Sequence, residues 1–491
     1  FGKVDGARNI QVIQKIEEAG STLGLGIRSR SHVFGQLAYR PTHYRDYLDA
    51  AERGVAPAYW GMAVNRRMQV HKYLMDNLKQ GLDPQQFSRL FGGDARQVIA
   101  HLAPSLAVVD TEDGRLTVPR DQQAGHQVNQ ALFDSRIIDR LYGHWIGQPK
   151  GWPEQTIAAA RDEPPYVPDL NFARFASTKL TKGIIYPPNA VPKRIAAAEV
   201  MSAWRDLAER IRTGKTIERV GIYCHVPYCA TKCTFCYCYT DELKEESVLS
   251  SYVDAVERQM RMMAPLVEGV RFNSVYFGGG TPSILRPERL DALLTTLFAH
   301  FAMTEDAQFN FEGTPNTLAR GRLDVLLKHG VNRLTMGVQS LDRAVLDGIG
   351  RMQQNAQGVH DLFFQARDAG VASINIDLVA GLPGQELASF EHDLNEVLGW
   401  RPDVLHVYPF SNLPDTTTFK DGYRMDDERM SMRSRMLERS HQAIMEAGYL
   451  EVQNESYALR HDARNRQDAE KLEFASSVMG FGYQARSHVF G

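Results

Sequence analysis

Cysteine is missing from nearly the whole of this 491-residue chain, because all five cysteines lie between positions 224 and 238. An odd number of close neighbours makes a poor disulfide framework. Long apolar runs are missing too, and no stretch approaches the roughly 18 residues that a membrane-spanning helix needs. Neither sign of charge dominates, since the net charge is −3. We therefore expect a cytoplasmic protein that binds neither a membrane nor nucleic acid.

The rest of the composition is that of a globular protein, with 43% hydrophobic and 23% charged residues. In the second half of the chain, strand-like and helix-like segments alternate. We expect strands at 218–223, 274–279, 308–313, 333–338, 373–381 and 404–410. The helical patterns between them include a stripe formed by Val253, Val256, Met260 and Met263. This alternation predicts an α/β fold with parallel strands, in which ligands bind at the carboxyl ends of the strands.

The cysteines themselves follow the spacing C-x3-C-x2-C-x-C, counted from Cys229. Three thiolates from one short loop can hold three irons of a cubane cluster and leave the fourth iron open. A structural zinc site usually has two well-separated ligand pairs, and this chain has no second pair. The spacing therefore favours an iron–sulfur cluster over zinc or an inert loop. Cys224 lies outside the pattern, and we expect it to be a small buried hydrophobic residue.

Polar and glycine-rich residues follow the expected strands. In "FGGGTPS", Gly278, Gly279 and Gly280 let the backbone approach a ligand closely and leave amide groups free to bind it. An ordinary glycine turn is the alternative. Glu312 ends the next expected strand, where a carboxylate suits the two hydroxyls of a ribose, although it could equally be a surface carboxylate.

The cysteine motif resembles that of the radical S-adenosylmethionine (SAM) superfamily. The longer pattern Y-x-H-x-P-[FY]-C-x3-C-x2-C-x-C is similar to that of the oxygen-independent coproporphyrinogen III oxidase family. Its matching residues beside the three cluster cysteines are Tyr223, His225, Pro227, Tyr228 and Cys238. The resemblance implies a partial (β/α)6 barrel and a 4Fe–4S cluster on Cys229, Cys233 and Cys236, whose open iron is chelated by SAM. It also implies that Cys238 is a neighbour of the cluster and not a ligand.

The resemblance extends to further residues in the same order along the chain. It implies catalytic roles for Tyr223, Glu312 and Asp377. It implies cofactor binding by Tyr223, Phe235, Gly278, Gly279, Gly280, Thr281, Glu312, Gln339, Arg351, Asp377 and Ser411. In the oxidase family two SAM molecules share one site, so the matches at Phe235, Gln339, Arg351 and Asp377 make a second SAM plausible here.

One segment is present twice. Residues 7–35 and 463–491 align without gaps and are identical at 16 of 29 positions. In the oxidase family such a segment closes the catalytic domain and leads into a helical domain, whose counterpart here follows the first copy. We infer a circularly permuted order, with an excerpt of a tandem protein as the alternative.

We therefore expect four regions. They are a repeat copy at 1–35, a mostly helical, winged-helix-like accessory domain at 36–130, a linker and pre-barrel segment at 131–215, and the radical SAM domain at 216–491. In the accessory region Ala95, Val98, Ile99 and Leu102 form a helical stripe, and a hairpin turns at Asp113 and Gly114. This region lacks a basic stripe, so we expect it to face the substrate and not DNA.

The activity implied first is oxidative decarboxylation of a tetrapyrrole propionate, with a flavodoxin or ferredoxin as electron donor. Arg460, Arg464 and Arg466 are candidates for binding propionates, or else a solvated run of charge. Related methyltransferases and cyclopropane-forming enzymes, in which a second SAM donates carbon to a natural product, give the second hypothesis, because residues 451–459 depart from the oxidase pattern. A haem-binding chaperone is the third.

Overall fold

The structure, a computed structural model, describes most of residues 37–119 and 193–489. Shorter gaps within these ranges fall at 42–43, 56–58, 64–69, 71–72, 75–76, 79–80, 104–105, 217–218, 239, 320, 414–415, 454–455, 468, 470–475, 484 and 486. The first repeat copy and the expected linker up to residue 192 lie outside the described residues. None of the described helices is both long and apolar enough for a membrane span.

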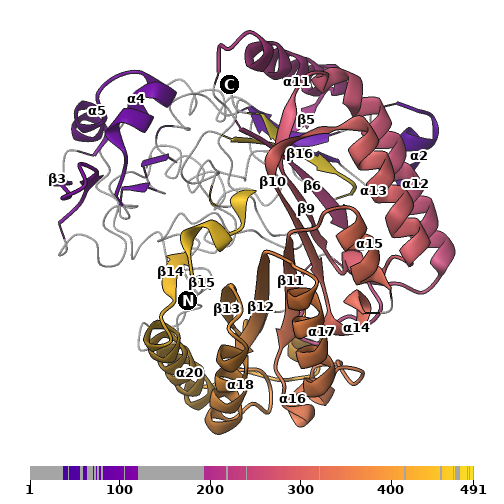
Figure 1. The fold of residues 1–491 in the computed structure, drawn as a ribbon, viewed down its shortest axis with the longest axis vertical. Coiled ribbons are helices and arrows are strands. Elements are labelled where there is room, and N and C mark those ends of the chain that lie inside the picture. Colours follow the sequence, from indigo (N-terminus) through magenta and orange to yellow (C-terminus); the bar gives the residue numbers. More distant parts are fainter. Residues whose placement is uncertain are drawn as a thin grey trace, which may run out of the picture.

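The centre of the molecule is a curved sheet whose middle strands are all parallel (Figure 1). In spatial order these strands are β16 (Ser476–Phe481), β6 (Arg219–Val226), β9 (Arg271–Gly279), β10 (Ala302–Gly313), β11 (Arg333–Gln339), β12 (Ser373–Ala380) and β13 (Val404–Pro409). Each of the six strands expected from the sequence is present. The predicted α/β partial barrel is therefore confirmed.

Helices follow the parallel strands and cover the outer side of the curved sheet (Figure 1). They are α12 (Glu246–Met263), α13 (Pro287–His300), α14 (Pro315–Leu318), α15 (Arg322–Lys328), α16 (Arg343–Gly348), α17 (Ala356–Asp368), α18 (Leu387–Trp400) and α20 (Asp427–Glu446), with α11 (Ala197–Arg212) before the barrel. The short helix α19 (Thr417–Lys420) instead contacts the cysteine loop, where the amide of Thr418 donates to Thr234 O at 2.9 Å. The predicted stripe at Val253, Val256, Met260 and Met263 is buried in α12. Burial of each such side chain contributes roughly 1.5–3 kcal/mol.

Alternation along the strands separates two faces of the sheet. In β11, Leu334, Met336 and Val338 belong to the apolar core. Arg333 and Thr335 alternate with them and bond to Asn310, so they lie on the other face. Parallel strands buried on both faces usually read as continuous apolar runs. Packing alone does not explain why the inner face of this barrel is polar.

Antiparallel strands extend the sheet at both edges. They are β14 (Leu450–Gln453) and β15 (Ser456–Ala458) beyond β13, and β17 (Ser487–Val489), β1 (Leu37–Pro41), β2 (Tyr59–Ala63) and β5 (Lys193–Ile195) beyond β16. The helix α2 (Tyr44–Glu52) also packs on α12, where Tyr47 Oη donates to Gln259 Oε1 at 2.9 Å. The expected boundaries at 36 and 216 therefore do not separate structural units, because 37–63 and 193–195 complete the sheet of the barrel.

A smaller unit holds two helices, of which α5 carries the expected stripe, and the expected hairpin of the accessory region. These elements are α4 (Pro84–Phe91), α5 (Ala95–Leu102), β3 (Val109–Asp110) and β4 (Leu116–Thr117). The carboxylates of Asp83 and Asp94 cap the two helices by accepting backbone amides of their first turns. Gly114 takes a positive φ of 77° in the turn, as expected for the glycine of a tight hairpin. The winged-helix assignment stays a prediction.

The second repeat copy supplies the strands that join the barrel to its edge. β16 lies parallel to β6, and the buried Gln467 side chain donates from Nε2 to the carbonyl oxygen of Ile222 at 2.7 Å. β17 then pairs antiparallel with β1, with Val489 opposite Leu37. The strand that follows the first copy in sequence thus lies beside the strand that ends the second copy.

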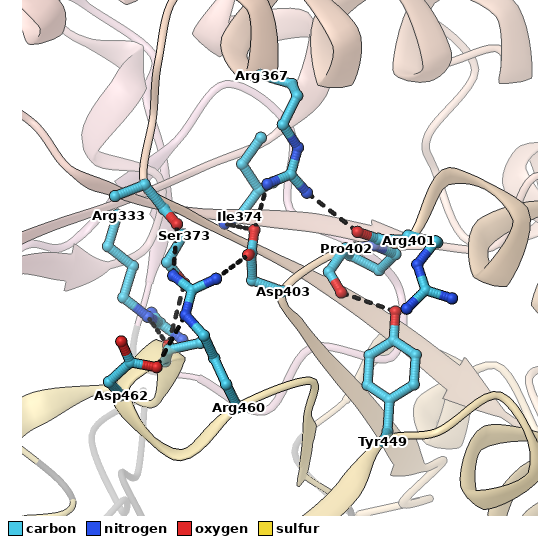
Figure 2. Close-up of polar contacts among 12 residues, drawn as sticks. Arg333, Arg367, Ser373, Ile374, Arg401, Pro402, Asp403, Tyr449, Arg460 and Asp462 are labelled. Atoms are coloured by element: carbon cyan, nitrogen blue, oxygen red, sulfur yellow. Dashed lines mark hydrogen bonds and ion pairs between the residues drawn. The ribbon is translucent and has the colours of Figure 1, made fainter.

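A polar network closes the barrel where the strands begin (Figure 2). The buried Asp403 accepts Arg367 Nη1 at 2.7 Å, Arg460 Nη1 at 3.1 Å and the amide of Ile374 at 3.0 Å. Ser373 Oγ donates to the carbonyl oxygen of Ala463 at 3.0 Å. The segment that carries Arg460 is therefore fixed at the amino-terminal edge of the sheet.

Candidate functional site

The cysteine loop begins where β6 ends. The two-residue strands β7 (Tyr228–Cys229) and β8 (Asp241–Glu242) pair with each other and close the loop. Between them lie Cys233, Cys236 and Cys238, which like Cys229 are half-buried. Cys224 points into the apolar core from β6, as predicted, and burial raises its pKa.

Neighbouring side chains donate hydrogen bonds to all three of the predicted cluster ligands. Thr281 Oγ1 donates to Cys229 Sγ at 3.3 Å, and Arg351 Nε donates to Cys233 Sγ at 3.2 Å. The thiol of Cys238 donates to Cys236 and lowers the pKa of Cys236, a shift to which the charge of Lys232 also contributes. Burial raises the pKa of Cys229 to about 11. Donors aimed at sulfur favour the thiolate forms that an iron–sulfur cluster needs.

The donor set fits a cluster better than a single ion. In the described parts of the chain, no three Cys, His, Asp or Glu side chains meet as they would around one metal ion. A cubane instead spreads its thiolates over three separate irons, and three thiols in one short loop match that demand. Cys229, Cys233 and Cys236 are therefore the residues that would hold the cluster.

The glycine segment after β9 packs tightly against the start of the cysteine loop. A Cβ on Gly280 would lie 2.6 Å from the carbonyl oxygen of Tyr228, and one on Gly279 would lie 2.8 Å from that of Val226. The amide of Gly280 donates to Val226 O at 2.7 Å and that of Thr281 to Tyr228 O at 2.8 Å. The Gly280 amide is therefore not free for a ligand, which corrects the expectation for that glycine, and the Thr281 amide is also bonded. The segment needs glycine because it lies directly against the loop.

Glu312 lies on the inner face of β10 and is buried. Tyr276 Oη donates to its carboxyl group, and Gly278 lies beside it, since a Cβ there would be 3.0 Å from Glu312 Oε2. Burial raises the pKa of Glu312 to about 8 against the effect of the Tyr276 hydrogen bond, and the nearby Asp377 adds to the rise. Tyr223, on β6, packs its ring 5.8 Å from that of Tyr276, and its hydroxyl is 2.9 Å from His225 Nδ1. Tyr223 and Glu312 are thus joined through Tyr276, a residue that the sequence did not single out.

A second group of predicted residues gathers around Gly337 of β11. Arg351 donates from Nη1 to the carbonyl oxygen of Gly337, and Asp377 lies opposite Gly337 in the β11–β12 register. Gln339 ends β11 with a φ of 72°, and its Nε2 would be 3.0 Å from a Cβ at Gly337. A non-glycine residue with positive φ at a strand end stores strain of the kind found at ligand sites. The structure thus brings Gln339, Arg351 and Asp377 together.

The two weaker predictions lie at the edges of this group. Phe235, from the cysteine loop, packs on the apolar cluster that contains Ile349, Val379 and Phe410. Ser411 lies two residues after the end of β13 and is buried. Both therefore lie on loops beyond the carboxyl ends of strands.

The three arginines near the second repeat copy are not at this site. Arg460 pairs with Asp403 and with Asp462, where Nε and Oδ1 are 2.8 Å apart (Figure 2). Arg466 donates from Nη1 to Asp306 Oδ2 at 3.1 Å, and the carbonyl oxygen of Arg464 accepts Gln308 Nε2 at 2.8 Å. Asp403 precedes β13, Asp462 precedes β16, Asp306 lies in the first half of β10 and Gln308 lies near the middle of β10, whereas the cysteine loop follows the end of a strand. This placement argues against a role of Arg460 and Arg466 in binding propionates at the cluster, and it fits the alternative of surface charges, which here form ion pairs.

The sequence also missed His406 and Tyr408 on β13 and Asn375 on β12. His406 Nδ1 is 2.9 Å from Asp377 Oδ1, and Asn375 Nδ2 donates to the same oxygen at 2.8 Å. The signal was present, since polar residues alternate with apolar ones in "NID" and "LHVY".

Comparison with known proteins agrees with this geometry. Residues 223–397 match the family model of the Radical SAM superfamily. This part of the barrel is therefore similar to radical SAM domains, a family whose members bind a 4Fe–4S cluster and SAM.

Within that class the chain resembles one enzyme in particular. It is 32% identical over 246 residues to the oxygen-independent coproporphyrinogen III oxidase of Salmonella typhimurium, covering 50% of this chain and 53% of the relative. The Escherichia coli K12 enzyme is 34% identical over 195 residues, covering 40% and 42%. The chain spans about half the length of the curated relatives it matches. The solved structure of coproporphyrinogen III oxidase from Escherichia coli superposes with a TM-score of 0.52 and 26% identity, over 60% of this chain and 69% of that chain. The resemblance that the cysteine motif indicated is thereby confirmed.

Proposed function

We propose that this protein is a radical SAM enzyme that decarboxylates propionate side chains of a tetrapyrrole. The observation that carries the proposal is a set of contacts with the cysteine loop. The glycine segment donates backbone hydrogen bonds to the loop, and Arg351 bonds both to Cys233 of the loop and to Gly337 of β11. The similarity to oxygen-independent coproporphyrinogen III oxidases supports the choice of substrate. In the proposed reaction a propionate loses one hydrogen atom to the 5′-deoxyadenosyl radical, one electron to a one-electron acceptor, and carbon dioxide, which leaves a vinyl group.

When bound, the cluster and SAM supply a 5′-deoxyadenosyl radical that removes hydrogen from the substrate. The protein's own residues position the reactants. Thr281 and Arg351 orient the thiols of Cys229 and Cys233. Tyr276 donates a hydrogen bond to Glu312 and holds it in place. Because the pKa of Glu312 is raised to about 8, its carboxyl group keeps its proton at neutral pH. It can therefore both donate a hydrogen bond to a ribose hydroxyl and accept one from it. The proposed roles of Tyr223, Glu312 and Asp377 are thus in binding and orienting SAM at the inner face.

We also propose that a second SAM binds beside the first. Gln339, Arg351 and Asp377 gather around Gly337, and Arg351 also donates to Cys233 in the loop that carries Phe235. This grouping is what the family resemblance requires of a second SAM site. Reduction of the cluster needs an electron donor, for which we propose a flavodoxin or ferredoxin.

The test is an anaerobic incubation of cluster-reconstituted protein with SAM, dithionite and coproporphyrinogen III, analysed by mass spectrometry. The proposal predicts 5′-deoxyadenosine together with products that have lost carbon dioxide and carry vinyl groups. Deoxyadenosine with an unchanged tetrapyrrole would contradict the substrate and leave the radical chemistry standing. A product that gains a methyl or methylene group would favour the methyl-transfer hypothesis instead.

A further inference from the structure

The inner face of β13 carries an imidazole and a phenol that the cluster and SAM residues do not account for. His406 and Tyr408 alternate along this strand with Leu405 and Val407, which lie in the apolar core. In the β12–β13 register His406 lies opposite Asp377, which places it on the same face as Asp377. The imidazole is therefore part of the polar lining of the barrel.

The hydrogen bonds around His406 fix its orientation. Its Nδ1 is 2.9 Å from Asp377 Oδ1 and 2.8 Å from the hydroxyl of Tyr408. Because a carboxylate oxygen only accepts, we place a proton on Nδ1, which then donates to Asp377. In the described part of the chain, no hydrogen bond reaches Nε2, and the side chain is 19% exposed. Nε2 is thus the atom that can meet a ligand.

Two further features indicate that the inner face around His406 can bind a ligand. Tyr408 is 37% exposed, an unusual position for a large aromatic side chain on a strand of the barrel. Asn375, fully buried beside it, has no hydrogen-bond partner for Oδ1 among the described residues. A buried amide with one unmatched atom indicates a ligand or ordered water. His406 Nε2 and Asn375 Oδ1 are therefore polar atoms of the inner face that can each form a further hydrogen bond.

His406 lies at the opposite end of the parallel series from the strand that leads into the cysteine loop. The cysteine loop follows β6, whereas β13 is the last strand of the series β6, β9, β10, β11, β12 and β13. The curved sheet nevertheless brings the end of β13 to this loop, since Phe235 packs on the cluster that contains Phe410 and the amide of Thr418 donates to Thr234 O at 2.9 Å. A ligand at His406 would therefore lie on the same inner face as Asp377 and the residues proposed to bind SAM.

We propose that His406, with Asp377 behind it and Tyr408 beside it, binds a carboxylate of the substrate other than the one that reacts. Asp377 holds the ring by accepting the Nδ1 proton, and the doubly protonated imidazole donates a charge-assisted hydrogen bond from Nε2–H to that carboxylate. His406 is in this account a specificity-determining residue for a polycarboxylate. The inference rests on the proposed tetrapyrrole substrate and extends it.

The experiment measures binding of coproporphyrin III to the cluster-reconstituted protein by quenching of its fluorescence. His406→Ala is expected to raise the Kd about tenfold, the loss of one charge-assisted hydrogen bond. His406→Gln is expected to recover part of this loss, because the glutamine amide can occupy the place of Nε2. The matched control is His360→Ala, which removes an imidazole from the outer helix α17 and should leave the Kd unchanged. SAM binding should be unchanged in all three variants.

Two further comparisons decide the outcome. Wild-type protein should prefer coproporphyrin III to its tetramethyl ester, and His406→Ala should reduce that preference. Equal binding of coproporphyrin III by wild type and His406→Ala would overturn the inference and leave the proposed substrate intact. A weaker affinity of His406→Ala for SAM would also overturn it, since His406 would then act through Asp377 on SAM. Wild-type protein that binds neither porphyrin would overturn the tetrapyrrole substrate and this inference together.

Discussion

Glu312 shows how the barrel uses burial to set the protonation of a single residue. Its carboxyl group is 7% exposed on a polar inner face, with Tyr276 as hydrogen-bond donor and Asp377 nearby. Desolvation disfavours the charged form more than one hydrogen bond favours it. The residue therefore enters the site as a neutral acid in the cofactor-free protein.

This raised pKa predicts how stability depends on pH. Between the ordinary value of 4.5 and the folded value of about 8, the folded protein holds one more proton than the unfolded chain. The free energy of unfolding must then fall as pH rises through this window, by at most about 1.4 kcal/mol per pH unit. We expect urea unfolding of cofactor-free protein to show this loss, and Glu312→Gln to lack it. Glu288→Gln, on the exposed start of α13, should follow the wild type. Parallel curves for all three proteins would contradict the assignment.

The sequence predicts those site residues that belong to a motif. It does not predict those that reach the site only through the fold. Cys229, Cys233 and Cys236 follow from the spacing together with its resemblance to the radical SAM motif. Tyr276 and His406 do not, because their importance arises from side-chain contacts with Glu312 and Asp377 across neighbouring strands. Arg460 was misplaced for a similar reason, since a sequence does not say at which end of a sheet a loop returns.

At the scale of elements, the short segment after β15 is attached to the base of the barrel by charge. Asp403 joins Arg367 on α17, the amide of Ile374 at the start of β12, and Arg460 on the returning segment (Figure 2). Three donors on one buried carboxylate satisfy it fully. The segment that leads to β16 is thereby held in place before it pairs with β6.

Removing this carboxylate should destabilise the protein. Asp403→Ala leaves the guanidinium of Arg367 without its buried partner, and we expect the free energy of unfolding to fall by about 3 kcal/mol. The control is Asp306→Ala, which breaks an ion pair with Arg466. The side chain of Asp306 is 76% exposed. That change should amount to less than about 1 kcal/mol. Denaturant unfolding measures both, and equal losses would refute the role given to Asp403.

The barrel elements were largely predictable, whereas the edges of the sheet were not. All six expected strands are apolar runs bounded by turn residues, a local signal. β1, β2, β5 and β17 are strands of five residues or fewer that are identified by their partners. Their pairing is tertiary information, and for that reason the expected boundary at 36 divides a continuous sheet.

At the scale of the whole molecule, the structure describes the position of the second copy of the repeated segment. The strands β16 and β17 come from the second copy and lie between β6 and β1. We propose that the chain has a rearranged order, because only residues 490, 491 and 36 would separate β17 from β1 if the second copy ran directly into the strand that follows the first. The regions at 1–35, 36–130, 131–215 and 216–491 are on this account regions of sequence, and the sheet crosses their boundaries.

The two copies offer a matched pair of substitutions. Gly482 has a φ of +95°, and a Cβ there would lie 2.8 Å from the carbonyl oxygen of His225 and against the hydroxyl of Tyr252. We expect Gly482→Ala to lower the free energy of unfolding by about 2 kcal/mol or more. Gly26 is the equivalent residue of the first copy, and Gly26→Ala should change it by less than about 0.5 kcal/mol. A larger effect at Gly26 than at Gly482 would mean that the first copy occupies this position.

The central claim is that the cysteine loop carries a cluster that cleaves SAM. The measurement that tests it most directly is 5′-deoxyadenosine formation by reconstituted protein with SAM and dithionite, in wild type, Cys233→Ala and Cys224→Ala. The account predicts cleavage by wild type and by Cys224→Ala, whose cysteine is only a core residue, and cleavage no faster than the protein-free blank for Cys233→Ala. Normal cleavage by Cys233→Ala, or none by wild type with an intact cluster spectrum, would contradict it.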